Sequence, residues 1–218
     1  MREKGRNSFV HLIWIELLTA QKNSTYSHKK AQSLMKKERA TSISKYLSLV
    51  LRHNPAAAGV TLDAEGWVSV GDLLSGAARH GHSFTRAELE EVVQTNEKQR
   101  FAFSPDAQRI RANQGHSVSV ELGLTPETPP GILYHGTVDR FLSSIMSRGL
   151  EKRSRQHVHL SPDVETATRV GSRRGKPIIL KIDAASMHSA GFNFFCSANG
   201  VWLTDHVPPQ YISTMVES

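Results

Sequence analysis

The stretch that decides the fold reads Arg153-Ser154-Arg155-Gln156-His157-Val158-His159-Leu160-Ser161-Pro162. Its first half is cationic. Its second half alternates in the way that predicts a β-strand, with both histidines on one face and Val158 and Leu160 on the other. Ser161-Pro162-Asp163 then predicts a helix start, because serine is a common N-cap and proline suits the first helical position. A cationic, histidine-bearing strand that runs into a helix N-terminus is a natural binding site for an anion.

The composition bounds the class of protein. The sequence has 218 residues, enough for one large domain or two small ones, and 39% of them are hydrophobic, which suffices to bury a core. The formal net charge of +7 favours a polyanionic partner, nucleic acid first, although a merely basic protein stays open. The single cysteine, Cys196, excludes an internal disulfide and a multi-cysteine zinc cluster and fits a reducing compartment. We therefore expect a cytoplasmic protein.

Residues 1–38 form a basic extension, for which disorder and partial helix both stay open. The apolar run from Phe9 to Leu18 falls short of the roughly 20 residues that a membrane span needs. A signal peptide is the alternative, since basic residues precede the run, but no small-residue cleavage pattern follows it cleanly. We expect no membrane association.

Residues 39–120 give helical and extended signals in the order of a winged-helix domain. Apolar residues at three- and four-residue spacing predict a helix from Ala40 to His53, which Asn54-Pro55 ends. The other expected elements are a strand at Val60–Leu62, an extended piece at Trp67–Val70, a short helix that ends near Gly81, a helix opened by the capping box Thr85-x-x-Glu88, and a β-hairpin with arms Arg100–Phe103 and Gln108–Arg111. Such domains usually bind nucleic acid, but many mediate protein contacts.

A proline-rich linker at residues 121–130 separates this part from a second one at residues 131–218. Strands with a few helices between them predict an α+β fold for the second part. The expected strands are Ile132–Thr137, Pro177–Ile182, Phe192–Phe195 and Val201–Leu203, and the expected helices pass through Phe141, Ile145 and Leu150, with Gly149 at the end, and through Val164, Ala167 and Val170. The sequence contains no internal repeat, P-loop or dinucleotide-binding glycine fingerprint.

Three arginines, Arg52, Arg100 and Arg155, each lie where an expected element ends or begins. Guanidinium groups stay charged at any working pH and bind phosphate through paired hydrogen bonds, so three that converged would hold a dianion. His157 and His159 have the spacing of metal ligands on a strand, but no fitting third ligand lies nearby in the sequence. We therefore expect no metal.

Six motifs in this order resemble the RNA 2′-phosphotransferase family, the tRNA-splicing type that uses NAD. They are Leu51-Arg52-His53, Asn96-Glu97-Lys98-Gln99-Arg100-Phe101, Arg111-Ala112-Asn113-Gln114-Gly115-His116-Ser117, Tyr134-His135-Gly136-Thr137, Arg155-Gln156-His157-Val158-His159-Leu160-Ser161 and Asn199-Gly200-Val201-Trp202-Leu203. The resemblance spans about residues 40–212 and leaves out residues 1–38.

The resemblance implies an N-terminal winged-helix lobe that binds RNA, at residues 39–120, and an ADP-ribosyltransferase-like α/β lobe that binds NAD, at residues 131–218. It implies a two-step reaction without metal. The internal 2′-phosphate of RNA displaces nicotinamide from NAD, which gives RNA 2′-phospho-ADP-ribose. The ribose O2″ then attacks that phosphate and releases RNA with a 2′-hydroxyl and ADP-ribose 1″,2″-cyclic phosphate. NAD is thus a co-substrate, the other substrate is a tRNA-like RNA, and we expect a monomer.

The resemblance also implies residue roles. The family's catalytic and phosphate-binding set maps onto Arg52, His53, Arg100 and Arg155. Contacts with NAD are implied for His135, Gly136, Thr137, His159, Leu160, Ser161, Asn199 and Val201, and contacts with RNA for Gly115, His116 and Ser117. Many ADP-ribosyltransferases have a catalytic glutamate where this sequence has Val201, which fits a nucleophile that is already an anion. His53 either contacts the phosphate or transfers a proton, and we favour phosphate contact with help in the second step.

Two other functions stay open at this point. One is ADP-ribosyl transfer to another acceptor, such as a terminal phosphate on nucleic acid or a protein, which would leave the label on the acceptor. The other is a non-catalytic winged-helix nucleic-acid-binding protein with a degenerate second lobe, which would bind duplexes and show no affinity for NAD. An assay of the product separates the first, and an NAD-binding measurement separates the second.

Overall fold

The computed structural model describes residues 35–215 of the chain. It divides into two compact units, Met1–Lys45 and Tyr46–Ser218. The described residues of the first unit are helical, and Thr41 Oγ1 donates a hydrogen bond to the carbonyl oxygen of Lys37 at 2.8 Å. Most of the predicted extension, residues 1–34, lies outside the described residues. The rest of the chain is a mixture of helices and small antiparallel sheets, which confirms the predicted α+β class.

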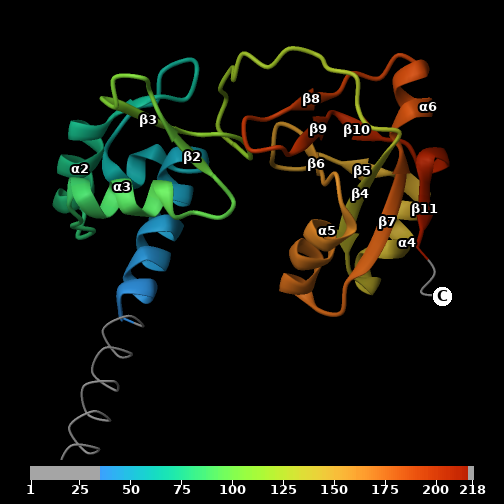
Figure 1. Ribbon diagram of the computed structural model, residues 1–218, viewed down its shortest axis with the longest axis horizontal. Coiled ribbons are helices and arrows are strands. Elements are labelled where there is room, and N and C mark those ends of the chain that lie inside the picture. The colour runs from blue at the N-terminus through green and yellow to red at the C-terminus, as the bar shows by residue number, and fades with distance from the viewer. Residues whose placement is uncertain (1–34, 216–218) are drawn as a thin grey trace, which may run out of the picture. The chain divides into compact units, whose positions relative to one another are not determined.

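The first half of the described chain has most of the predicted elements in the predicted order. A helix covers residues 35–52, so the predicted helix end at Arg52 and His53 is confirmed. The elements that follow are η1 (Pro55–Ala58), β1 (Val68–Ser69), α2 (Val70–Arg79), α3 (Arg86–Gln94), β2 (Phe101–Phe103) and β3 (Arg109–Ala112). The strands form one antiparallel sheet in the order β1-β3-β2, of which β2 and β3 are labelled in Figure 1.

Local chemistry explains several of these boundaries. The Thr85 side chain accepts a hydrogen bond from the Glu88 backbone, and the Glu88 carboxylate accepts one from the Thr85 backbone, which confirms the predicted capping box of α3. The Ser69 hydroxyl caps α2, so the extended piece predicted to reach Val70 ends one residue earlier. The predicted hairpin is confirmed, and Phe103 pairs with Ile110 in it.

The strand predicted at Val60–Leu62 is wrong. The backbone N–H of Val60 bonds back to the carbonyl oxygen of Pro55 at 3.2 Å, in the 3₁₀ turn η1, instead of pairing with a neighbouring chain. A short apolar run specifies a strand only when a partner strand is available, and here β3 already pairs with β1 and β2.

No helix or strand is assigned to residues 119–130, which leads to the second half. This half has the order β4 (Ile132–Thr137), α4 (Asp139–Arg148), β5 (Leu150–Glu151), β6 (Val158–Leu160), α5 (Val164–Gly171), η2 (Ser172–Arg174), β7 (Ile178–Asp183), α6 (Ala184–Ser189), β8 (Phe195–Cys196), β9 (Trp202–Thr204), β10 (His206–Val207), η3 (Pro209–Tyr211) and β11 (Ile212–Thr214). The sheets have the orders β11-β7-β4, β6-β9-β8 and β10-β5. An isolated bridge between Tyr134 and Ser161 joins β4 to the end of β6.

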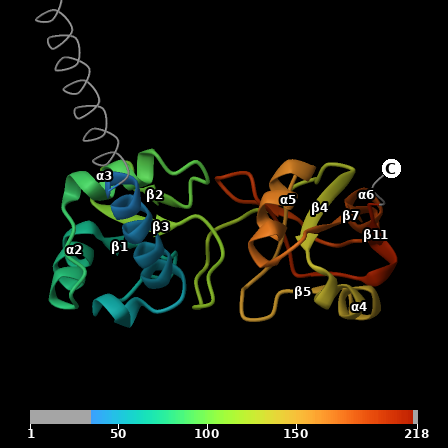
Figure 2. The same cartoon turned by 90° about the horizontal axis from the view of Figure 1, so that it is seen from below.

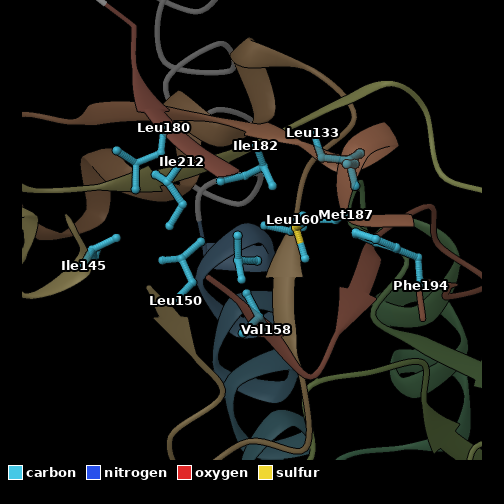
Figure 3. Packing of buried hydrophobic residues seen from close by; sticks show 12 residues of the cluster. Leu133, Ile145, Leu150, Val158, Leu160, Leu180, Ile182, Met187, Phe194 and Ile212 are labelled. Atoms are coloured by element: carbon cyan, nitrogen blue, oxygen red, sulfur yellow. The ribbon is translucent and has the colours of Figure 1, made fainter. Parts of the chain in front are cut away.

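An apolar cluster lies beneath these sheets. Figure 3 shows Leu160 from β6, Ile182 from β7 and Met187 from α6 pointing toward the same interior, together with Phe194 from the segment before β8. All four side chains are at most 1% exposed. Helix α5 lies against β4 in both ribbon views (Figures 1 and 2). This packing holds strands β4 and β6 in place. These strands carry the candidate site residues His135, Thr137 and His159.

Three predicted boundaries in this half are wrong. Ser161 is not an N-cap, because its backbone pairs with Tyr134 in an extended conformation. The cap of α5 is Asp163, whose carboxylate accepts a hydrogen bond from the Thr166 backbone at 2.6 Å. Leu150 lies in β5 and not in the preceding helix, which ends at Arg148 before Gly149. The strand predicted from Phe192 reduces to β8, since Phe194 is turned into the core.

Candidate active site

Arg52 ends the helix at residues 35–52 and is 9% exposed. Its guanidinium lies 5.8 Å from the centre of the Phe101 ring, and its Nη2 atom reaches the carbonyl oxygen of Arg100 in a long contact of 3.5 Å. Burial, followed by the charges of Arg100 and Arg155, lowers the pKa of Arg52 to about 10. Arg52 therefore remains charged at neutral pH in a place where two other cations oppose it.

His53 follows directly and is held by the loop that carries Ser117. The His53 Nδ1 atom lies 2.9 Å from the Ser117 hydroxyl oxygen, and the Ser117 backbone N–H donates to the carbonyl oxygen of Arg52 at 2.9 Å. Partial burial first, and then the charges of Arg52 and Arg155, lower the pKa of His53 below its ordinary value. A neutral imidazole at this position can accept or donate a proton at working pH.

Arg100 joins the site from the loop before β2. Its side chain donates to the Asn96 side-chain oxygen at 3.3 Å, and burial lowers its pKa. Its carbonyl oxygen accepts a hydrogen bond from the Asn113 backbone at 2.9 Å, which ties this loop to the end of β3. Within residues 35–215, none of Arg52, Arg100 and Arg155 forms an ion pair with a carboxylate. The three arginines that were predicted to converge thus carry positive charge that no carboxylate in this range neutralises by an ion pair.

Arg155 precedes β6 and bonds to a histidine on that strand. Its Nη1 atom lies 2.7 Å from the Nδ1 atom of His159. A guanidinium has only donors, so His159 Nδ1 must accept this hydrogen bond, and the ring proton lies on Nε2. Burial, followed by the Arg155 and Arg52 charges, lowers the pKa of His159 to about 3. His159 is therefore a neutral acceptor that holds the Arg155 fork.

His135 on β4 has the opposite tautomer. Its Nδ1 atom lies 3.0 Å from the backbone carbonyl oxygen of His159, which can only accept, so Nδ1 carries the proton and Nε2 keeps its lone pair. Burial is the main cause that lowers the pKa of His135. His159 on β6 can therefore donate a hydrogen bond from Nε2, whereas His135 on the neighbouring β4 can accept one at Nε2.

The assigned tautomer of His159 can be read directly by nitrogen NMR. We expect Nδ1 of His159 to stay unprotonated from about pH 8 down to about pH 5, because a proton there would face the Arg155 guanidinium. The matched control is Arg155→Ala, in which the loss of the nearby cation should raise the pKa of His159. A His159 resonance with the proton on Nδ1 in the wild type would contradict the assignment.

Gly115 and His116 lie beside this set. Gly115 has φ +87°, and a Cβ atom there would lie 3.7 Å from both Arg52 Nη1 and His159 Cε1. His116 is 1% exposed, and neither of its ring nitrogens has a hydrogen-bond partner within the described residues. Burial first, followed by the charges of Arg52 and His53, lowers its pKa to about 4. Its backbone carbonyl accepts a hydrogen bond from Gln156 at 3.1 Å, which connects this loop to the stretch before β6.

A cavity of about 360 Å³ opens along β4, α4 and the stretch before β6. Five of the residues predicted for the site line it: His53, His135, Thr137, Arg155 and His159. The other predicted residues are not among its lining: Arg52, Arg100, Gly115, His116, Ser117, Gly136, Leu160, Ser161, Asn199 and Val201. A volume of this size lies at the lower end of the range of about 300–1,000 Å³ for small-molecule pockets.

Several of the remaining residues that were predicted to contact NAD pack or form hydrogen bonds within the protein. Gly136 packs against α5, and a Cβ atom there would lie 2.0 Å from the carbonyl oxygen of Ala167. Leu160 points into the apolar core and is 1% exposed. The Asn199 side chain donates to the carbonyl oxygen of Lys98 at 2.8 Å. The Val201 carbonyl oxygen closes the turn between β8 and β9 by accepting from the Ser197 backbone at 3.0 Å. Their roles toward NAD stay predictions.

The cavity also has lining residues that the sequence reasoning missed or set aside. They include Phe141, Arg153, His157 and Arg174. The run Arg173-Arg174-Gly175-Lys176 was visible in the sequence as a cationic loop after a helix, and it could have drawn attention to Arg174. No grouping of three or more His, Cys, Asp or Glu side chains suited to a metal ion occurs in residues 35–215. In the same range, no helix combines the length and apolar character of a membrane span.

The sequence is similar to a set of known bacterial proteins over most of its length. A chain from Streptomyces griseus is 55% identical over 185 residues, covering 82% of this chain and 98% of its own length. Others, from Trichormus variabilis and Rhodopirellula baltica, are 54% and 56% identical and cover 83% and 79% of this chain and 100% and 94% of their own. All three carry the name "Probable RNA 2′-phosphotransferase". The profile of the family described as RNA 2′-phosphotransferase, Tpt1 / KptA family matches residues 38–206. With this match over most of its length, the chain belongs to the RNA 2′-phosphotransferase, Tpt1 / KptA family.

Proposed function

We propose that this protein removes an internal 2′-phosphate from RNA by transferring it to NAD. Membership of the RNA 2′-phosphotransferase family supports the transferase reaction and the RNA substrate. The observation that carries the proposal is the grouping of Arg52, His53, Arg100 and Arg155. Arg52 reaches the Arg100 carbonyl oxygen at 3.5 Å, and a Cβ atom on Gly115 would lie 3.7 Å from both Arg52 and His159, the histidine to which Arg155 bonds. Uncompensated guanidinium groups favour a dianionic phosphate, to which each can donate paired hydrogen bonds.

In the first step, an oxygen of the RNA 2′-phosphate forms a bond to C1″ of the nicotinamide ribose as the bond to nicotinamide breaks. Nicotinamide leaves with the electron pair of that bond and is neutral. The attacking phosphate is already an anion, so this step needs positioning rather than a general base. Arg52, Arg100 and Arg155 would hold the phosphate, and the neutral His159 would fix the direction of the Arg155 fork.

In the second step, the ribose O2″ attacks the phosphorus and the bond to the RNA 2′-oxygen breaks. O2″ loses a proton and the RNA oxygen gains one, which yields a 2′-hydroxyl and ADP-ribose 1″,2″-cyclic phosphate. Negative charge accumulates on the phosphoryl oxygens in this transition state, and the guanidinium groups would stabilise it. His53, whose pKa is lowered and whose Nδ1 is held by Ser117, is the group that we propose for phosphate contact and proton movement.

The two halves of the chain would then divide the substrates. We propose that residues 39–120 are a winged-helix lobe that faces RNA, and that residues 131–218 are an ADP-ribosyltransferase-like lobe that binds NAD. The order helix, helix and antiparallel hairpin in the first half supports the former. The cavity along β4, α4 and β6, which five of the predicted site residues line, supports the latter.

Incubation with a 2′-phosphorylated oligonucleotide tests the proposal. We expect conversion to a 2′-hydroxyl only when NAD is present, with one nicotinamide and one cyclic-phosphate product formed per RNA. ADP-ribose in place of NAD is the matched control and should support no turnover, since it lacks the leaving group. Release of inorganic phosphate without NAD would overturn the proposal, and label that remains covalently on an acceptor would favour plain ADP-ribosyl transfer.

A further inference from the structure

The Phe141 ring is surrounded by three guanidinium groups. Arg140, Arg153 and Arg174 lie 4.8, 5.8 and 6.0 Å from the ring centre. Phe141, Arg153 and Arg174 line the cavity, whereas Arg140 does not. The three cavity-lining members of this group, Phe141, Arg153 and Arg174, are called the Phe141 subsite. They come from separate segments, namely α4, the stretch before β6, and η2.

The charge of the Phe141 subsite is not neutralised by the protein. Among residues 35–215, neither Arg153 nor Arg174 makes an ion pair or a side-chain hydrogen bond, and the guanidinium group of each lies over the Phe141 ring. The neighbouring Lys152 does pair with a carboxylate, Asp205, at 3.2 Å. Among the described residues that line the cavity, Glu151 is the single acidic one. Guanidinium groups that face a cavity without acidic partners attract an anionic ligand.

The subsite shares its cavity with Arg155 and His135 of the proposed reaction centre, and the backbone of one of its members is strained. After burial, the charge of Arg174 further lowers the pKa of both Arg155 and His135, so these side chains lie within electrostatic range of one another. Arg153 has φ +52°, a left-handed backbone conformation that is uncommon for a residue other than glycine. Such a conformation persists only where its surroundings enforce it, and it is often found where a loop clamps a ligand.

We propose that the Phe141 subsite binds the pyrophosphate of the dinucleotide substrate, with Arg153 and Arg174 as its two arms. The inference rests on the proposed function and deepens it, because it assigns the adenylate half of NAD to specific residues of this chain. A pyrophosphate carries two negative charges one bridging oxygen apart, and two guanidinium groups over one ring in the cavity lining match that pattern. Arg155 and His53, which also line the cavity, remain for the RNA phosphate.

Binding of ADP and of ADP-ribose, measured by calorimetry without RNA, tests the assignment independently of turnover. We expect Arg153→Ala and Arg174→Ala each to weaken both ligands about tenfold or more, as expected for one lost charge-assisted hydrogen bond. The affinity for 2′-phosphorylated RNA, measured in parallel, should change less than about twofold. Arg140→Ala is the matched control, since it removes the same charge from the same ring outside the cavity, and it should leave ADP binding unchanged.

The outcomes distinguish a failure of the Phe141 subsite assignment from a failure of the proposed function. Unchanged ADP affinity in both variants, or an equal loss in Arg140→Ala, would overturn the subsite while NAD-dependent turnover by the wild type still stands. A loss of RNA affinity as large as that for ADP would show that these arginines serve the RNA backbone instead. A wild type that neither binds ADP-ribose nor consumes NAD would overturn the proposed function itself. Thermal unfolding of each variant confirms that a loss of affinity is not a loss of fold.

Discussion

Arg155→Ala is expected to lower the rate of 2′-phosphate removal by about 10- to 150-fold, because one charge-assisted hydrogen bond is worth about 1.5–3 kcal/mol. Arg155 faces the cavity and is held by His159 at 2.7 Å, so its truncation also releases that histidine. In the two-step reaction that we propose, the loss should be larger in the second step, where phosphoryl charge is greatest. RNA 2′-phospho-ADP-ribose should then accumulate and be visible as a slower-migrating band.

Two further variants test whether the loss of activity is specific to the guanidinium group of Arg155. Arg155→Lys keeps the charge but loses the planar fork, so it should recover only part of the activity. Arg169→Ala is the matched control, because Arg169 is a half-exposed arginine on α5 whose ion pair with Glu165 lies at the surface. It should leave turnover unchanged. Wild-type rates in Arg155→Ala would remove this arginine from the reaction and leave its hydrogen bond to His159 as a structural contact.

Gly136→Ala is expected to destabilise the fold more than any surface change. The added Cβ would lie 2.0 Å from the Ala167 carbonyl oxygen and 2.9 Å from the Gly171 backbone nitrogen, and neither backbone atom can move without shifting α5. Overpacking of this kind costs about 1–3 kcal/mol or more. For a protein of this size, about 3 kcal/mol corresponds to a fall in Tm of roughly 6–12 °C, readable by calorimetry.

The same substitution should also impair activity, since β4 carries His135 and Thr137 and α5 leads into the turn that carries Arg174. Gly131→Ala is the control, because a Cβ atom added there would meet no described atom within 4 Å and the φ of Gly131 is not in the left-handed region. Its free energy of unfolding should stay within about 0.5 kcal/mol of the wild type. Equal melting temperatures for Gly136→Ala and the wild type would show that α5 can move away from β4 at little cost.

Local signals in the sequence predicted many of the elements correctly. The capping box at Thr85 and Glu88, the hairpin around Ser104–Ala107 and the alternation of Val158 and Leu160 each depend on contacts between near neighbours, and the structure confirms all three. The errors occur where the backbone hydrogen bonds differ from those that the local pattern predicts. Ser161 pairs with Tyr134 across the sheet, so the helix waits for Asp163, and Val60 bonds back to the turn η1 instead of joining a strand.

For the candidate site, too, the sequence indicated some features, and others required the tertiary structure. The motifs around Arg52, Arg100 and Arg155 indicated the family and the residue types that a phosphate needs, because chemistry of this kind can be recognised from side-chain identity. The sequence could not give the acceptor role of His159, which depends on which atom of Arg155 meets which ring nitrogen. The sequence also could not show whether position 136 is glycine because α5 packs closely against it or because a ligand approaches it. Either role requires a residue without a Cβ atom.

The sequence alone thus determined the α+β class, the order of most elements and the cationic, histidine-rich character of the stretch from Arg153 to Pro162. Those properties follow from composition and from periodicities over a few residues. Only the tertiary structure decided that the guanidinium groups of Arg153 and Arg174 both lie over the Phe141 ring, while that of Arg155 bonds to His159. Contacts between segments far apart in the chain depend on how the sheets and helices pack, and no local pattern encodes that packing.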